Sequence, residues 1–541
     1  MILWFSKYLI KKQYYWLIIF IILLAIFSYL LWTKGDNLFV NYADIVFHQA
    51  VARGFIRADG PVTWNFWEAL PEGRANNYPP IYHIILASLF STGISIAIAI
   101  KVITLVTVVG GLIVFWLGLV KLFDWKIVTF SILTVLLSFK FILFSTMVQP
   151  ATLVLWFTPW VLIFLREKRW INLTALLIIL LYLHMIMPYF IIFGAIFYAL
   201  FYQRKDLVKL LKSVSIALVV YLPWLGQIFL HRSSIKYLNS SIDDLGPSVK
   251  IWSFDLLFWA LFIAGMIILI KSKKIVKSEF YYFIFIAILI LPVSYFYPVR
   301  ALNGHSFLLL APIVGLAINY LSKYYFGIFA LIILSGMLAG NFYFRVSNVG
   351  GWDFKNDKSS VREMVQYRTI NQDSRSGERQ VVELISNNSQ VGESVAIIMN
   401  RFKGFSVGID DQIHVANYFA SLANRPVLNM RQPELSKREI PDFSRTKILI
   451  TSVPLLEINT LYLLYPDLAK NPAISNALLE NFQFISSVDL DSSNKVFLYK
   501  NIQKDVYKEI TAKPSIPLKL AHILIVLLVA LIIIPKNKNH K

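Results

Sequence analysis

The sequence predicts a polytopic α-helical membrane protein with about twelve transmembrane helices and an extracytoplasmic α/β domain before the last of them. Of its 541 residues, 57% are hydrophobic and 15% are aromatic, and the mean hydropathy is +0.62. These values exceed those of ordinary soluble domains. Uncharged runs such as Tyr14–Trp32 are long enough to cross roughly 30 Å of hydrocarbon. The basic residues also alternate between successive loops, as they do in membrane proteins.

Twelve apolar stretches are the predicted spans. They lie near residues 14–32, 94–120, 127–148, 150–165, 170–187, 188–202, 213–230, 253–270, 280–297, 306–321, 324–341 and 518–535. The first stretch is too long for the apolar region of a signal peptide and lacks a small-residue cleavage site, so we expect a retained anchor. No segment repeats at a fixed period, which argues against an inverted-repeat transporter.

The net charge of +21 is best explained by orientation in the membrane. With the N-terminus inside, the predicted cytoplasmic segments hold 20 basic residues against four acidic ones, whereas the outer segment 33–93 holds four against five. This asymmetry follows the positive-inside rule and predicts that both termini are cytoplasmic and that residues 342–515 are extracytoplasmic. The basic excess therefore indicates topology in a plasma membrane, and no nucleic-acid partner is expected.

Residues 342–515 interrupt the hydrophobic pattern, with 21 Lys and Arg against 19 Asp and Glu. Buried strands are predicted at Ser394–Met399, Val427–Met430 and Lys447–Ser452. Helices are predicted at Arg379–Ser386 and Gln412–Asn424. A hairpin is predicted from Phe482–Val488 and Lys495–Lys500. This order predicts a small α/β domain. It would follow a transmembrane domain of residues 1–341, and residues 516–541 would form a last helix with a basic tail.

The first outer loop, residues 33–79, is longer than a connector requires. Loops of this length are usually functional or disordered. Its aromatic residues, Phe55, Trp64, Phe66 and Trp67, are unlike a disordered composition. We expect short helices that lie on the membrane surface.

Within this loop, the stretch NYADIVFH places Asp44 four residues before His48. On a helix the two side chains would share one face. A carboxylate held near the outer leaflet can accept a proton from a hydroxyl or bind a cation. It can equally be a solvated acid on a surface helix, and one Asp/His pair is only a weak indication of a metal site.

Two further stretches carry candidate site residues. In NNYPPIYH, Pro79 and Pro80 fix the backbone ahead of the next helix, where His83 would cap or pack. Arg300 and His305 lie in an outer connection between two spans. A guanidinium suits the geometry of a phosphate, although an interfacial anchor is an equal alternative.

Several kinds of chemistry are excluded by the sequence. The chain has no cysteine, so it has no disulfides, thiolate metal sites or cysteine nucleophiles. It has no Gly-rich nucleotide-binding loop, no HExxH zinc motif and no GxSxG serine nucleophile.

The loop resembles the GT-C superfamily of membrane glycosyltransferases, in particular the protein O-mannosyltransferase and lipid-A aminoarabinose transferase branch. The resemblance depends on a first span, an acid early in a long outer loop, the small residues Ala50, Ala52 and Gly54, and the returning YPPIYH segment. Relatives have an acidic pair where this chain has an alanine before Asp44, and a lysine where it has Tyr78. The motif match covers residues 41–93, and the likeness in architecture extends to about residue 341.

This resemblance implies that a sugar is transferred, as a hexosyl or pentosyl group, from a polyprenyl-phosphate donor to a protein, lipid or glycan acceptor at the outer membrane face. Asp44 would be the general base, and Arg300, helped by His305, would bind the donor phosphate. His48, Tyr78 and His83 complete the candidate acceptor-site residues. The resemblance does not establish a cofactor, and a divalent cation is left open.

Two other functions stay open at this stage. An oligosaccharyltransferase-like enzyme is suggested by Trp352-Asp353, which matches part of the Trp-Trp-Asp acceptor motif of that group, and metal dependence would favour it. A non-catalytic polytopic scaffold or transporter predicts no loss of function when Asp44 is neutralised.

Overall fold

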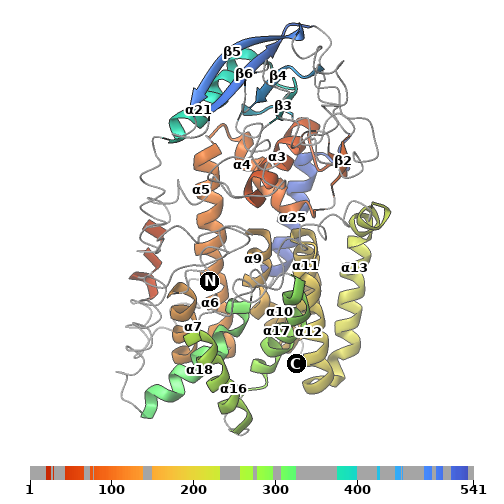
Figure 1. Cartoon of the computed structure of the whole chain (residues 1–541). Helices are drawn as coiled ribbons and strands as arrows, with labels where there is room; N and C mark the ends of the chain where they lie inside the picture. Colours follow the sequence, from red (N-terminus) through yellow and green to blue (C-terminus); the bar gives the residue numbers. More distant parts are fainter. Residues whose placement is uncertain are drawn as a thin grey trace.

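The protein consists of a helical bundle with a four-stranded sheet at one end (Figure 1). The computed structural model describes residues 20–22, 24–25, 28–29, 43–65, 67, 73–76, 78–94, 96–137, 149–231, 256–271, 277–296, 306–324, 374–398, 423–426, 445–451, 454, 480–489, 495–503 and 513–533. The bundle helices are α5 (Ile96–Leu105), α6 (Gly111–Leu122), α7 (Trp125–Leu137), α9 (Gln149–Trp156), α10 (Thr158–Arg166), α11 (Trp170–Leu183), α12 (Met187–Tyr202), α13 (Leu207–Leu230), α16 (Leu256–Lys271), α17 (Glu279–Phe296), α18 (Ser306–Tyr324) and α25 (Leu518–Ile533).

Every span predicted between residues 94 and 321 contains a described helix, and α25 occupies the last predicted span. Residues 14–32 are described only in part, and 324–341 lie outside the description, so the total of about twelve stays a prediction. Two described helical stretches, Ile98–Leu122 and Arg204–Leu230, are long and apolar enough to cross a membrane.

Two helices are irregular where the sequence predicts continuous spans. A π-helical turn, η1 (Val106–Gly110), lies between α5 and α6, and the predicted span 150–165 is broken at Phe157 into α9 and α10. Pro159, at the start of α10, explains the break because it cannot supply a backbone N–H to a continuous helix. The indole N–H of Trp160 donates to the Val114 carbonyl at 2.9 Å and so joins α10 to α6, the helices that follow the two irregular regions.

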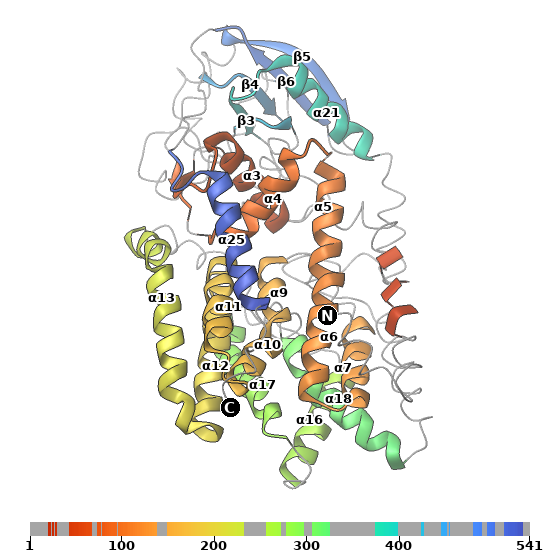
Figure 2. The same ribbon diagram turned by 180° about the vertical axis from the view of Figure 1, so that it is seen from behind.

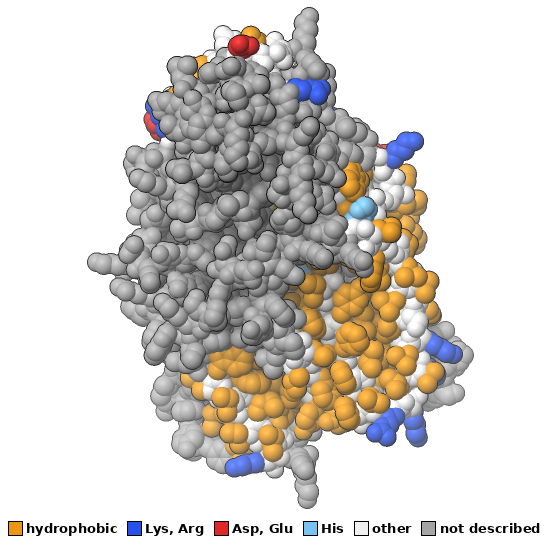
Figure 3. All heavy atoms as spheres, turned by 45° about the vertical axis from the view of Figure 1, so that its right-hand side comes forward, with side chains coloured by type: hydrophobic (Ala, Val, Ile, Leu, Met, Phe, Trp, Pro, Cys, Tyr) orange, Lys and Arg blue, Asp and Glu red, His pale blue; other side chains and the backbone are white. Residues whose placement is uncertain are grey.

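Large apolar side chains are exposed on several described helices of the bundle. Figure 3 shows a broad hydrophobic face with Lys and Arg side chains along its lower rim. On α13, Ile216, Val219, Leu222 and Phe229 are each more than half exposed. A soluble monomer rarely exposes an apolar surface of this extent, whereas a lipid-facing surface requires it.

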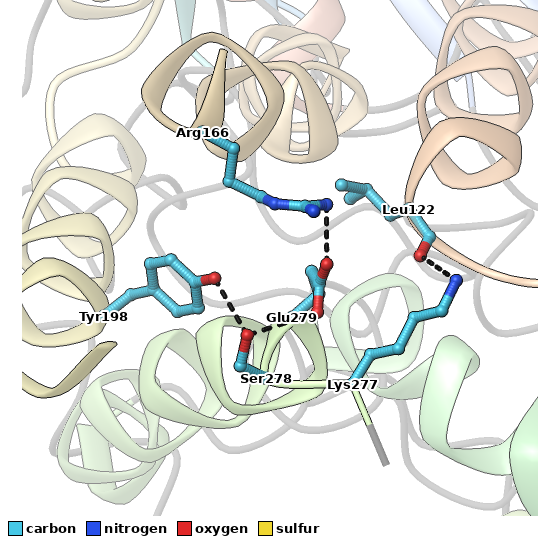
Figure 4. Close-up of polar contacts among 6 residues, drawn as sticks. All are labelled: Leu122, Arg166, Tyr198, Lys277, Ser278 and Glu279. Carbon is cyan, nitrogen blue, oxygen red and sulfur yellow. Dashed lines mark hydrogen bonds and ion pairs between the residues drawn. The ribbon is translucent and has the colours of Figure 1, made fainter. Parts of the chain in front are cut away.

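Polar contacts hold the bundle together at the end away from the sheet (Figure 4). Arg166, at the end of α10, forms an ion pair of 2.6 Å with the buried Glu279 at the start of α17. Ser278 links Glu279 to the Tyr198 hydroxyl of α12, at 3.3 and 3.1 Å. Lys277 donates to the Leu122 carbonyl of α6 at 3.1 Å, so four helices meet in one network.

The sheet has the strand order β3-β4-β6-β5, with β3 parallel to β4 and the other pairs antiparallel. The domain elements are α21 (Ser374–Asn388), β3 (Val395–Ile398), β4 (Ile448–Thr451), β5 (Phe482–Asp489) and β6 (Lys495–Asn501). Val381 and Ile385 of α21 pack on its apolar core. The described elements thus combine a mixed sheet with a helix, whereas the extent of the domain and its extracytoplasmic position stay predictions. The predicted strand at 427–430, most of the helix at 412–424 and the domain start at 342 lie outside the described residues.

Candidate active site

The candidate site is built on α3 (Ala43–Ala58) and α4 (Ile81–Ser91), which pack together between the sheet and the bundle (Figures 1 and 2). The helix predicted in the first outer loop is present, but it does not lie on a surface. Val51 and Phe55 of α3 have no exposed area, because this helix packs on α4 and belongs to the main apolar core. A short pair of strands, β1 (Trp64–Asn65) and β2 (Arg74–Ala75), closes the loop before Pro79 and Pro80.

A hydrogen-bonded histidine pair joins the two helices. Nδ1 of His48 lies 2.8 Å from Nε2 of His83, and both rings are buried, with exposed fractions of 3% and 0%. Burial and, to a smaller extent, the nearby His184 lower the pKa of His48 to about 3. Burial, followed by the proximity of His48, also lowers the pKa of His83. Both imidazoles are therefore neutral at physiological pH, one as donor and the other as acceptor.

Aromatic side chains enclose this pair. The ring centroid of His48 lies 4.8 Å from that of Tyr78 and 5.1 Å from that of Tyr82, both in edge-on geometry. Phe55 meets His83 at 5.6 Å. The structure thus brings together His48, Tyr78 and His83, the three residues that the sequence proposes for the acceptor site.

His184, at the end of α11, is a component that sequence analysis does not single out. Its Nδ1 accepts the backbone N–H groups of Ile186 and Met187, at 3.1 and 3.2 Å, and so satisfies the first turn of α12. A neutral ring that accepts at Nδ1 carries its proton on Nε2. The ring lies 5.6 Å from Tyr78, so the α11–α12 connection borders the same cluster.

The other predicted site residues are placed less completely. Asp44 lies in the first turn of α3, four residues before His48 as expected, but its side chain is outside the described part of the chain. Arg300 and His305 also fall outside the described residues.

Arg53 is a partly buried cation in the described part of α3. Its guanidinium carbon lies 5.1 Å from the centroid of the Phe90 ring, and its Nε is buried without a hydrogen-bond partner among the described residues. Burial lowers the pKa of Arg53. Nine helical positions separate it from Asp44, so the two residues lie on opposite faces of α3.

The described residues do not contain a group of three or more His, Asp or Glu side chains that could hold a metal ion. The His48–His83 pair presents two nitrogens, and a protein metal site normally needs at least one further ligand.

Comparison with known proteins agrees with the predicted architecture. The chain matches no known family profile, and no curated protein matches its sequence. Its structure is similar to the crystal structure of ArnT from Cupriavidus metallidurans bound to undecaprenyl phosphate. The TM-score is 0.53 at 12% sequence identity, and the likeness covers 92% of this chain and 99% of that one. At this level of identity the likeness shows a shared fold, in agreement with the architecture that the sequence resemblance implies.

Proposed function

We propose that this protein is a GT-C-type glycosyltransferase that moves a sugar from a polyprenyl-phosphate donor to an acceptor at the outer membrane face. The observation that carries the proposal is the fold. The chain shares its architecture, over nearly its whole length, with a structure that holds undecaprenyl phosphate. The candidate loop acid also begins a helix that is enclosed between the bundle and the outer domain.

In the proposed reaction, Asp44 takes the proton from the acceptor hydroxyl as its oxygen bonds to the anomeric carbon of the sugar. The bond between that carbon and the phosphate oxygen breaks at the same time, and the polyprenyl phosphate leaves with the electron pair. Arg300 and His305 stabilise the charge of the leaving phosphate. Such a site acts by positioning and by electrostatics that strengthen in the transition state.

In this proposal, the histidine cluster lines the acceptor site. His48 lies one helical turn after Asp44, and Tyr78 and His83 border it from the returning segment. These groups are polar but neutral, so they can line an acceptor site without pairing with the base. A hexose or a pentose would fit the proposal equally, as would a protein, lipid or glycan acceptor.

The proposed setting is an integral plasma-membrane protein with cytoplasmic termini. The tail of a polyprenyl donor stays in the bilayer, so its enzyme must present the site at the membrane surface. The proposed reaction uses no resident cofactor and no nucleic acid. In the alternative function, an oligosaccharyltransferase-like reaction, Asp44 would bind a divalent cation.

The test is sugar transfer from a radiolabelled pool of polyprenyl-phosphate sugars in reconstituted membranes. Asp44→Asn should abolish transfer while the protein keeps its wild-type elution profile and thermal unfolding temperature. Asp59→Asn is the matched control, because Asp59 is the exposed acid at the other end of α3 and asparagine tolerates its positive φ of 56°.

Equal transfer by wild type and Asp44→Asn would remove Asp44 as the base. A folded wild-type protein that transfers no sugar from any donor would favour the scaffold. Loss of transfer with a chelator, restored by a divalent cation, would favour the oligosaccharyltransferase-like alternative.

A further inference from the structure

The chain returns from the outer domain to the bundle by way of the candidate site. The segment Lys513–Pro517, here called the strap, precedes α25 and lies against the C-terminal end of α3. The Ser515 N–H donates to the Pro61 carbonyl at 2.7 Å, and the Leu518 N–H donates to the Asp59 carbonyl at 2.8 Å. Residues more than 450 positions apart in the sequence are thus joined by backbone hydrogen bonds.

Gly60 makes this contact sterically possible. A β-carbon at Gly60 would overlap the Ile516 carbonyl oxygen and lie 2.8 Å from the Pro514 β-carbon. The same turn also ends α3, because the Gly60 N–H donates to the Phe55 carbonyl at 2.8 Å. The strap therefore holds the residues that terminate the helix, and a larger residue at 60 must displace either the strap or α3.

The helix that follows the strap is fixed at both ends. Near its start, the His522 ring is hydrogen-bonded to the Ser88 hydroxyl of α4. Near its end, the Asn172 side-chain amide of α11 donates to the Leu531 and Ile532 carbonyls, at 2.7 and 3.0 Å. Figure 2 shows α25 passing from the region of α3 and α4 along the bundle. A simple membrane anchor for the outer domain would not need these contacts.

We infer that Gly60 is a positioning residue that, together with the strap, sets the position of α3 and hence of Asp44 and His48. An α-helix transmits a displacement at its C-terminus to its first turn, since its hydrogen-bonded backbone behaves as a rigid rod over 16 residues. The strap and α25 are thus part of the site. The effect on catalysis rests on the proposed function, whereas the effect on the position of α3 does not.

The position of α3 can be measured without sugar transfer, because the chain has no cysteine of its own. Ala52 is fully buried on the face of α3 that carries His48, so Ala52→Cys provides a single protected thiol. Its reaction with a membrane-impermeant maleimide should become at least about ten-fold faster when Gly60→Ala is added, because the opening that exposes the thiol becomes easier. Gly226→Ala is the control, because a β-carbon there meets nothing within 4 Å, and it should leave the rate unchanged.

A second variant covers the case in which Gly60→Ala does not fold. Ser515→Pro removes the N–H that bonds to Pro61 and leaves every residue of α3 intact. It should also accelerate labelling of the thiol at position 52. Wild-type labelling rates in both variants, when they are folded, would overturn the inference.

Sugar transfer then tests the catalytic consequence. Displacement of the base should lower kcat by about ten-fold or more at an unchanged KM for the lipid donor, since small misplacements of reacting groups cost rate rather than binding. Faster labelling with unchanged kcat would refute the positioning of the site by the strap. Inactivity of the wild-type protein would bear on the proposed function and leave the labelling result valid.

Discussion

The neutrality of the buried histidine pair makes stability depend on pH in a calculable way. The pKa of His48 falls from 6.5 to about 3 on folding. Between these values the unfolded chain binds a proton that the folded protein does not, so protonation favours unfolding. The stabilisation is complete above the unfolded pKa and is lost progressively as the pH falls from 6.5 toward 3.

The magnitude follows from the two pKa values. Lowering the pH from 8 to 5.5 should reduce the free energy of unfolding by about 1.4 kcal/mol for one such histidine. His83, whose pKa is also lowered by burial, should add to this loss in the same direction.

The perturbation is His48→Asn, which keeps a polar side chain but cannot titrate. Thermal or denaturant unfolding in detergent, measured at pH 8 and pH 5.5, should show a pH-dependent loss that is smaller by about 1.4 kcal/mol than in wild type. His231→Asn is the matched control, because His231 is a partly buried histidine at the C-terminal end of α13. It should keep the wild-type difference in unfolding free energy between pH 8 and pH 5.5. An identical pH dependence in wild type and His48→Asn would refute the buried, neutral state of this ring.

Two charged networks give further predictions. Arg166→Met leaves the carboxylate of Glu279, which is only 6% exposed, without its partner. Because the Arg166 side chain is 40% exposed, we expect the free energy of unfolding to fall by about 2 kcal/mol. Adding Glu279→Gln should restore most of this loss, as measured by unfolding of both variants. The guanidinium of the buried Arg425 donates hydrogen bonds to Ser386 and Ser389 at the end of α21, and Arg425→Met removes them. The free energy of unfolding of the α/β domain should fall by about 3 kcal/mol, so limited proteolysis should cleave the domain faster. Lys495→Met, which removes an exposed ion pair, should leave the cleavage rate unchanged.

The sequence predicts the helical regions well because a membrane-crossing helix requires a long apolar run. It does not predict the π-helical turn at Val106–Gly110 or the break at Phe157, since neither changes the hydrophobicity of its segment. The aromatic composition of the first outer loop predicts helices on the membrane surface, but it does not show that α3 packs on α4 and is buried within the protein.

The candidate site is predictable only in its local parts. The spacing of Asp44 and His48 gives a shared helix face, and the two prolines give the start of α4. The contact of His48 with His83 joins residues 35 positions apart, so no local pattern contains it. His184 is not predicted for a different reason. It accepts backbone N–H groups at the start of α12, a role that Ser, Thr, Asp and Asn usually fill.

The neutrality of His48 has a chemical consequence for the proposed base. A cationic imidazole one turn from Asp44 would stabilise the ionised carboxylate and weaken it as a proton acceptor. It would also attract the donor phosphate toward the acceptor side of the site. Burial among Tyr78, Tyr82 and His83 prevents both effects, because it makes protonation of the ring unfavourable. The aromatic enclosure would thus preserve the basicity of Asp44 and leave the binding of the phosphate to cations elsewhere.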